Sequence, residues 1–96
     1  MPSLIATLKA KEEKVDEAVK FFQELQTHVK ANEPGTLEYV FHQKSGEPTT
    51  FVVYEKYADD EALKTHGANL AKVGERFRPI LDGAPEIVRI EELPRK

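Results

Sequence analysis

The chain has 96 residues and a net charge of −3, with 40% hydrophobic and 32% charged residues. This composition is typical of one folded, soluble domain spanning 1–96, and no Lys/Arg cluster is long enough to follow a nucleic-acid backbone. The absence of cysteine excludes disulfides, thiolate nucleophiles and zinc–thiolate sites. The early apolar run at 4–6 is far too short for a signal peptide or membrane span, so we expect a cytoplasmic protein with no membrane or nucleic-acid partner.

The first part of the chain predicts a strand followed by a helix. Residues 3–9 form the strand, and from 11 to about 30 the apolar residues recur at three- and four-residue steps, as along one helix face. The sequence NEPG at 32–35 ends this helix, because proline and glycine interrupt it. Gly35 follows Pro34 where the next strand begins, and we expect it to supply a positive φ angle.

A hairpin follows. Residues 36–43 alternate in the way a strand does, with Leu37, Tyr39 and Phe41 on one face. The turn at 44–48 leads into a second strand at 49–57, so the two strands pair.

The next segment predicts a helix in two pieces. Residues 58–61 begin it, and Asp59 or Asp60 caps it, since acidic residues complement the helix N-terminus. Gly67 is expected to end the first piece and Asn69 to cap the second.

A last strand at 86–93 completes the order β-α-β-β-α-β, which predicts an α+β sandwich of the ferredoxin-like kind. Two helices cover only one face of such a sheet, yet several strands carry apolar residues on both faces. Leu4, Val53 and Ile87 point to one face of their strands, and the following residues point to the other: Ile5, Val52, Tyr54 and Val88. We therefore expect a second copy of the chain to cover the open face in a homodimer, and a pocket between each sheet and its helices or its partner.

His66 is the strongest single candidate for a catalytic residue. It falls within the apolar stripe 63, 66, 70, 73, 77, where a packed, hydrogen-bonded histidine is the commoner outcome. The alternative is an acid–base group that faces the pocket, since imidazole titrates near neutral pH.

Glu55 and Tyr57 follow Phe51 and Val53 at a spacing of two and so share their face. A carboxylate in this place lies either at the solvent-exposed end of the strand or in the wall of a cavity. The sequence pattern does not distinguish these two positions. Phenol hydroxyls on Tyr39 and Tyr54 are further candidates, although a buried tyrosine usually satisfies its hydroxyl locally.

Cofactor and metal sites have little support in the sequence. The three histidines, His28, His42 and His66, lie in different elements, and no H-x-x-H or H-E-x-x-H spacing occurs. The glycines form no nucleotide, flavin or nicotinamide fingerprint, so we expect no cofactor and no metal.

The segment 35–66 resembles the antibiotic biosynthesis monooxygenase family. Members show a Gly-x-Leu-x-Tyr strand, then a Phe-x-x-Tyr-Glu-x-Trp/Tyr strand, an acidic helix start, Ala-Leu and a His. Here these are Gly35, Leu37, Tyr39, Phe51, Tyr54, Glu55, Tyr57, Ala62, Leu63 and His66. The resemblance implies a dimeric α/β barrel built from ferredoxin-like halves.

The resemblance also implies oxygenation of a small quinol or hydroxylated aromatic without metal or flavin, with molecular oxygen as co-substrate. In that activity His66 is the base or hydrogen-bond partner, Tyr57 positions the substrate ring, and Glu55 is an orienting carboxylate. We take the following residues as substrate-binding candidates: Tyr39, His42, Tyr54, Asn69 and Arg76.

The chain departs from several branches of the family. Many members have Trp where Tyr57 stands, and the haem-degrading branch uses an Asn on its first strand where this chain has Thr7. The residues 12–22 and 51–66 also resemble the enzyme that isomerises a phosphorylated autoinducer-2 signal, whose anionic substrate would need Arg76 or Arg78. A non-catalytic, dimeric small-ligand-binding barrel, in which His66 only packs, remains the alternative from a different class.

Overall fold

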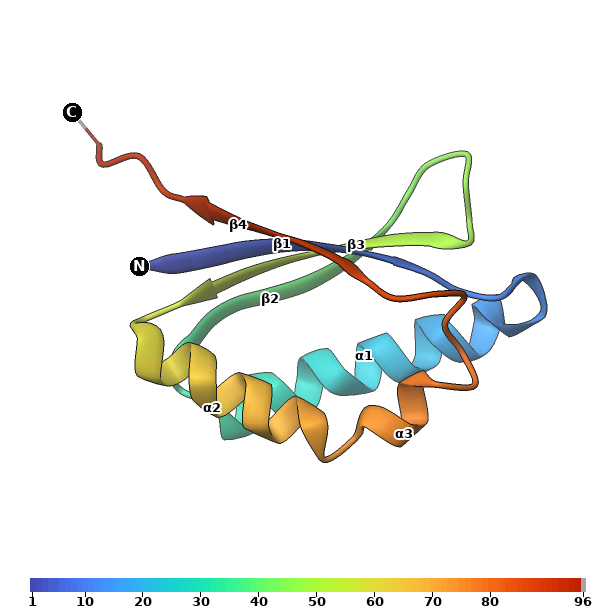
Figure 1. Cartoon of the computed structure of the whole chain (residues 1–96), viewed down its shortest axis with the longest axis horizontal. Coiled ribbons are helices and arrows are strands. Elements are labelled where there is room, and N and C mark those ends of the chain that lie inside the picture. The colour runs from blue at the N-terminus through green and yellow to red at the C-terminus, as the bar shows by residue number, and fades with distance from the viewer. Residues whose placement is uncertain (96) are drawn as a thin grey trace.

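The structure, a computed structural model, describes residues 1–95 and combines one sheet with helices on one side of it (Figure 1). The elements in chain order are β1 (Pro2–Lys9), a single 3-10 turn η1 (Glu12–Lys14), α1 (Val15–Asn32), β2 (Thr36–Gln43), β3 (Thr50–Tyr57), α2 (Asp60–Ala71), α3 (Gly74–Phe77) and β4 (Glu86–Glu91).

The four strands lie in the order β2-β3-β1-β4, and every neighbouring pair is antiparallel. Directly opposed residues in antiparallel strands point to the same face. Ala6 therefore shares its face with Val53 on one side and Ile87 on the other. The order and directions confirm the α+β, ferredoxin-like prediction.

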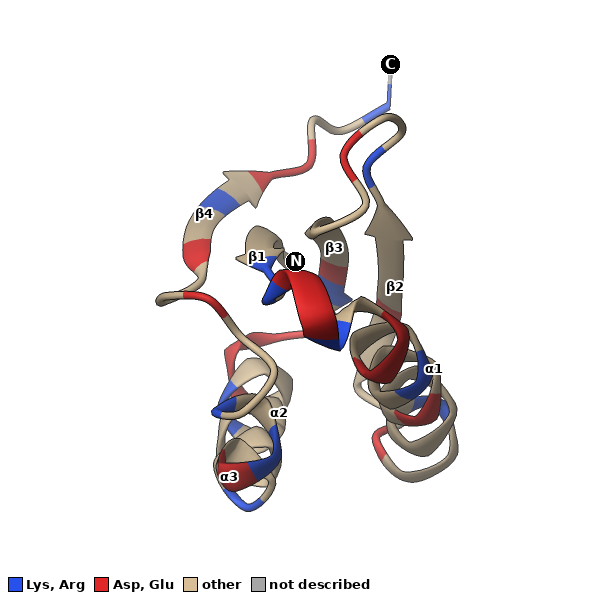
Figure 2. Ribbon diagram, turned by 90° about the vertical axis from the view of Figure 1, so that its right-hand side faces the viewer, with Lys and Arg blue, Asp and Glu red and all other residues tan. Residues whose placement is uncertain are grey.

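The helices cover one face of the sheet, with α1 and α2 side by side beneath it (Figure 2). Helix α1 buries most of the stripe that its spacing predicts, and it also buries Phe21, which lies beside that stripe. Phe22 belongs to the stripe and to the core. Its ring stacks on Phe41 at 4.4 Å between centroids and meets Phe51 edge-on at 5.0 Å. This packing fixes α1 against β2 and β3.

Helix α2 begins as the sequence predicts but does not break where expected. The Asp59 side chain accepts a hydrogen bond of 2.8 Å from the Ala62 N–H, which caps the first turn. Gly67 and Asn69 both lie inside α2, which runs on to Ala71, so the predicted stop at Gly67 and cap at Asn69 are wrong. One glycine costs a helix only about 1 kcal/mol, which a capped and packed helix tolerates.

Gly35 is needed for a reason other than the one expected. Within residues 1–95, positive φ angles occur only at Gly46 and Gly83, so the predicted positive φ at Gly35 is wrong. A Cβ atom at position 35 would instead lie 2.7 Å from the Cβ of Ala62. The glycine allows the start of β2 to approach α2 closely.

No described element covers the second face of the sheet (Figure 1). Three strands expose apolar side chains there: Ile5 is 36% exposed, Val40 38% and Val88 48%. No helix within residues 1–95 is long and apolar enough to cross a membrane.

Candidate functional site

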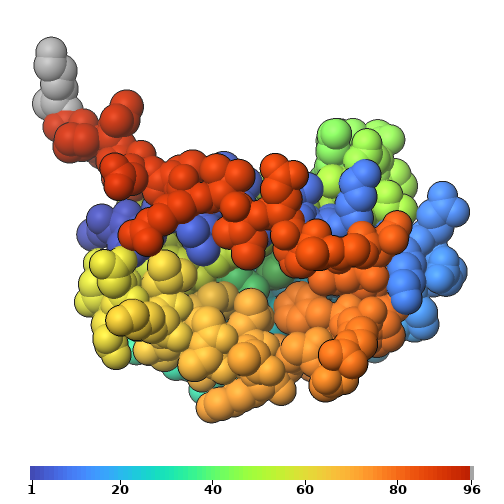
Figure 3. Space-filling view, in the orientation of Figure 1, coloured from blue at the N-terminus to red at the C-terminus, as the bar shows by residue number. Residues whose placement is uncertain are grey.

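A cavity of about 360 Å³ lies between the sheet and the helices α2 and α3. It appears in Figure 3 as a hollow between α2 and β4. Its walls are almost wholly apolar, and its lining residues are Ala6, Leu8, Tyr39, Phe41, Val53, Glu55, Gly67, Leu70, Ala71, Gly74, Phe77, Leu81, Pro85 and Ile87. This volume falls within the roughly 300–1,000 Å³ usual for small-molecule sites.

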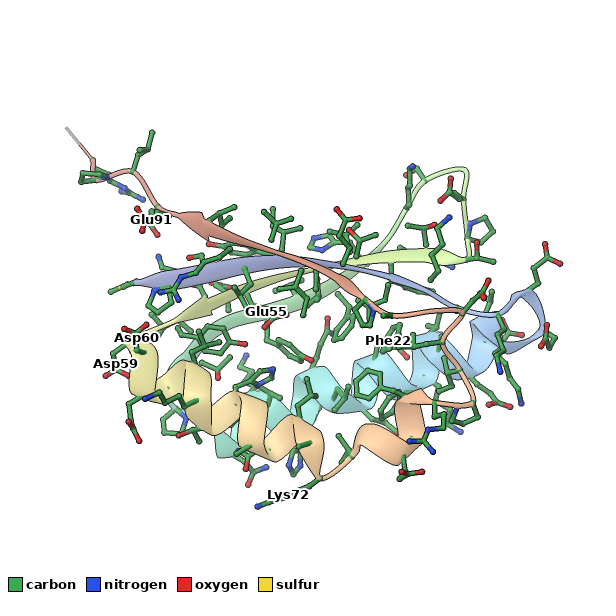
Figure 4. The ribbon with its side chains drawn as sticks, in the orientation of Figure 1. Phe22, Glu55, Asp59, Asp60, Lys72 and Glu91 are labelled. Carbon is green, nitrogen blue, oxygen red and sulfur yellow. The ribbon has the colours of Figure 1, made fainter. Side chains whose placement is uncertain are left out.

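Glu55 places a carboxyl group in this apolar wall. It lies on the helix-facing side of β3 (Figure 4) and is only 7% exposed. Burial raises the pKa of Glu55, and the hydrogen bond that the Tyr57 hydroxyl donates to its Oε1 only partly opposes this effect. A carboxylate with a raised pKa is a stronger base than an ordinary glutamate, so Glu55 is suited to accept a proton from a ligand.

His66 lies behind Glu55 and is held from the opposite side by Glu33. The His66 Nδ1 is 2.9 Å from Glu33 Oε1, and the two residues are 3% and 5% exposed. The same carboxyl accepts hydrogen bonds from Thr36 Oγ1 at 2.9 Å and from Asn69 Nδ2 at 3.2 Å. Burial alone would raise the pKa of Glu33, but these three partners outweigh it and lower the pKa.

The other ring nitrogen of His66 faces Glu55. Nε2 is 3.9 Å from Glu55 Oε1, is fully buried and has no hydrogen-bond partner. The rings of Tyr39 and Tyr57 enclose the imidazole, with centroids at 4.7 and 5.4 Å. Burial, followed by the nearby Glu55 carboxylate, raises the pKa of both phenols, so they stay protonated at neutral pH.

The structure brings five of the eight candidate residues together. Glu55 and Tyr39 line the cavity. Tyr57 is hydrogen-bonded to Glu55, and His66 and Asn69 are both hydrogen-bonded to Glu33. The carboxyl group of Glu55 therefore reaches the cavity, whereas the imidazole of His66 does not.

The other three candidates lie elsewhere. Register places His42 and Tyr54 on the open face of the sheet, since they oppose Val52 and Ile5. Arg76 lies on α3, and its guanidinium reaches α1, where it pairs with Glu24 at 2.9 Å and stacks over the Phe21 ring. None of the three reaches the cavity.

Glu33 is the site residue that the sequence analysis missed. It follows the last residue of α1, where the helix dipole disfavours a negative charge. An acidic residue in this place, directly before Pro34, was the available indication that the carboxylate has a specific partner.

Within residues 1–95, no group of three or more His, Asp or Glu side chains is arranged to hold a metal ion.

The model of the antibiotic biosynthesis monooxygenase family matches residues 1–71, and the chain belongs to this family. The Bacillus subtilis (strain 168) protein "Putative monooxygenase YcnE" is 34% identical over 90 residues, which are 92% of this chain and 94% of that protein.

Solved structures of the same fold agree with this membership. A Caulobacter crescentus CB15 protein described as a putative antibiotic biosynthesis monooxygenase is 36% identical, with a TM-score of 0.88 over 97% of this chain and 90% of that one. A Nitrosomonas europaea protein with the same description is 23% identical, covers 98% and 100%, and has a TM-score of 0.82, which supports the fold alone. Family and relatives together indicate a monooxygenase-like function.

Proposed function

We propose that the chain oxygenates a small, neutral quinol or hydroxylated aromatic with molecular oxygen and without a cofactor. The observation that carries this proposal is the single carboxyl group, Glu55, in the wall of an otherwise apolar cavity. Apolar walls bind an aromatic ring, and one buried base is what a substrate hydroxyl requires for its deprotonation.

Glu55 is the base in the proposed reaction. It takes the proton of the substrate hydroxyl, and the resulting anion is electron-rich enough to pass an electron to O₂. The apolar walls offer few polar groups that could hold water beside the reactive intermediates. Tyr57 orients the Glu55 carboxylate through its hydrogen bond, and Tyr39 forms the wall that separates the cavity from His66.

The lining chemistry disfavours the isomerase alternative. A phosphorylated dione needs Lys or Arg beside its phosphate, and no Lys or Arg occurs among the residues that line the cavity. The homodimer, the cytoplasmic location and the roles of the individual site residues stay predictions of this proposal.

Oxygen uptake with a panel of hydroquinones and naphthols tests the proposed activity. We expect turnover by the wild type that stops under anaerobic conditions. Glu55→Gln should lower kcat about 10²–10⁴-fold, because Gln keeps the shape but cannot accept the proton. Glu17→Gln, on the exposed surface of α1, makes the same charge change and should leave turnover unchanged.

Two results would contradict this proposal. Full turnover without oxygen would end the monooxygenase assignment. Tight binding of the panel with no turnover of any member would favour the non-catalytic binding barrel instead.

A further inference from the structure

We propose that Glu33 is a positioning residue, which holds the His66 proton on Nδ1 so that Nε2 receives and stores the proton that Glu55 takes from the substrate. The proton transfer from the substrate rests on the proposed function. The position of the His66 proton on Nδ1 is a property of the protein without substrate. Glu33 touches neither the cavity nor the substrate and acts only through His66.

The contacts of Glu33 fix the tautomer of His66. An ionised carboxylate only accepts hydrogen bonds, so the 2.9 Å contact requires the proton on Nδ1. Thr36 and Asn69 donate to the same carboxylate, which favours its ionised form and fixes its position. A neutral imidazole with a proton on Nδ1 has a free lone pair on Nε2.

That lone pair faces Glu55. A buried polar nitrogen without a partner is unusual, because most such atoms are hydrogen-bonded in folded proteins. Its nearest carboxyl oxygen, Glu55 Oε1, is 3.9 Å away, which is longer than a hydrogen bond by about 1 Å. The proposed transfer therefore requires a rotation of either side chain that closes this gap once Glu55 carries a proton to donate.

The proton step is balanced within the group. The substrate O–H bond breaks and an O–H bond forms on Glu55. That bond then breaks as an N–H bond forms on Nε2, which leaves Glu55 as a carboxylate and His66 as an imidazolium. The reverse transfer returns the proton to the reduced oxygen intermediate, so the group neither gains nor loses a proton over one turnover.

The surroundings of the ring suit a stored positive charge. The titratable groups that face it are Glu33 at the end of α1, Glu55 and Tyr57 on β3, and Tyr39 on β2. Two carboxyl groups flank the ring on opposite sides, and the two phenols stay neutral. The charge that develops on His66 is therefore compensated without solvent.

The tautomer is measured directly by ¹⁵N NMR of the protein without substrate. The signals of His66 are assigned by comparison with His28→Gln and His42→Gln, two exposed histidines. At pH 8.5 we expect a protonated Nδ1 and an unprotonated Nε2. Glu33→Gln should shift His66 toward the other tautomer, because the Gln amide can donate to Nδ1, whereas Glu17→Gln should not.

Activity provides the second measurement. Glu33→Gln should lower kcat at least about tenfold with little change in KM, because Glu33 does not touch the ligand, and Glu33→Asp should recover part of the loss. The wild-type tautomer tests the proposal even if Glu33→Gln does not fold.

The outcomes separate the two proposals. A wild-type His66 with its proton on Nε2, or with both nitrogens protonated at pH 8.5, overturns the role of Glu33 even if turnover is normal. An unchanged kcat in folded Glu33→Gln also overturns it. The expected tautomer in a protein that turns over no quinol leaves the geometry intact and refutes only the oxygenation.

Discussion

Two buried glutamates in this site have their pKa values moved in opposite directions. Glu33 has three hydrogen-bond donors, which stabilise its carboxylate and lower its pKa despite burial. Glu55 has one donor and an apolar cavity beside it, so burial dominates and raises its pKa. Environments that separate the pKa values of two like groups favour different roles for them, and we expect Glu33 to act as a fixed charge and Glu55 to exchange protons.

These opposite directions predict opposite effects of pH on stability. The lowered pKa of Glu33 contributes stability above its ordinary value of 4.5, which is lost as pH falls through the lowered pKa. Glu33→Gln should therefore destabilise the protein by about 1–3 kcal/mol at pH 7, with the difference shrinking below pH 4.5. For Glu55, stability is present below 4.5 and lost as pH rises through the raised pKa. The stability of Glu55→Gln relative to the wild type should therefore increase as pH rises.

Urea unfolding at several pH values between 3.5 and 8 measures both differences. Glu17→Gln serves as the control, since its side chain is exposed and should follow the wild-type curve. Parallel curves for Glu33→Gln and the wild type across this range would contradict the account of the buried pair.

Period-two and helical spacing together predict most of the site. Spacing puts Glu55 and Tyr57 on one strand face, and the stripe through 63, 66 and 70 turns His66 toward it. Glu33 could not be found in this way, because it follows a helix end and lies 33 positions from His66 in the chain. Periodicity describes the face of an element, whereas a contact between two element ends depends on how the elements pack.

At the scale of the elements, the junction of β2 with α2 depends on the missing side chain of Gly35. The Gly35 carbonyl accepts a hydrogen bond of 2.9 Å from the Ala58 N–H, and Ala62 lies so close that no Cβ fits at position 35 without a shift. This junction sets the distance from Glu33 and Thr36 to the helix that carries His66 and Asn69. A shift here would lengthen the hydrogen bonds of Glu33.

Gly35→Ala should destabilise the protein by roughly 1–3 kcal/mol, because its Cβ would lie 2.7 Å from the Cβ of Ala62 and the helix must move. Ala62→Gly in the same chain removes the clash, so the double variant should lose less than the sum of the two single variants. Thermal unfolding of all four proteins measures this coupling. Strictly additive losses would mean that the contact does not limit the junction.

Gly67→Ala is the matched control for that experiment. A Cβ at position 67 meets nothing within 4 Å, and the residue lies inside α2. Alanine there should stabilise the protein by about 0.4–1 kcal/mol, since glycine is the poorer helix former. The low cost of one glycine also explains why the predicted helix end at Gly67 is wrong. A glycine weakens a helix locally, but the Asp59 cap and the packing beyond Gly67 decide where the helix ends.

At the scale of the whole molecule, the chain exposes more accessible surface than is usual for a monomeric protein of its mass. Its accessible surface of 6662 Å² exceeds the about 5,600 Å² usual for a monomer of 10.9 kDa. Part of the excess is the apolar, uncovered face of the sheet, where strands β1, β2 and β4 present Ile5, Val40 and Val88. The sequence already showed the two-faced apolar pattern of these strands, and the expectation that a second copy of the chain covers the open face rests on that pattern.

We predict that a second copy of the chain covers this face. Light scattering at micromolar concentration should give about twice 10.9 kDa for the wild type. Val88→Lys puts a charge on the apolar face, on the edge strand β4 beside Ile5, and should shift the mass toward the monomer, because burying an unpaired lysine in an interface is costly. Thr27→Lys adds the same charge to the exposed side of α1 and should leave the dimer intact. A wild type that stays monomeric at this concentration would refute the prediction.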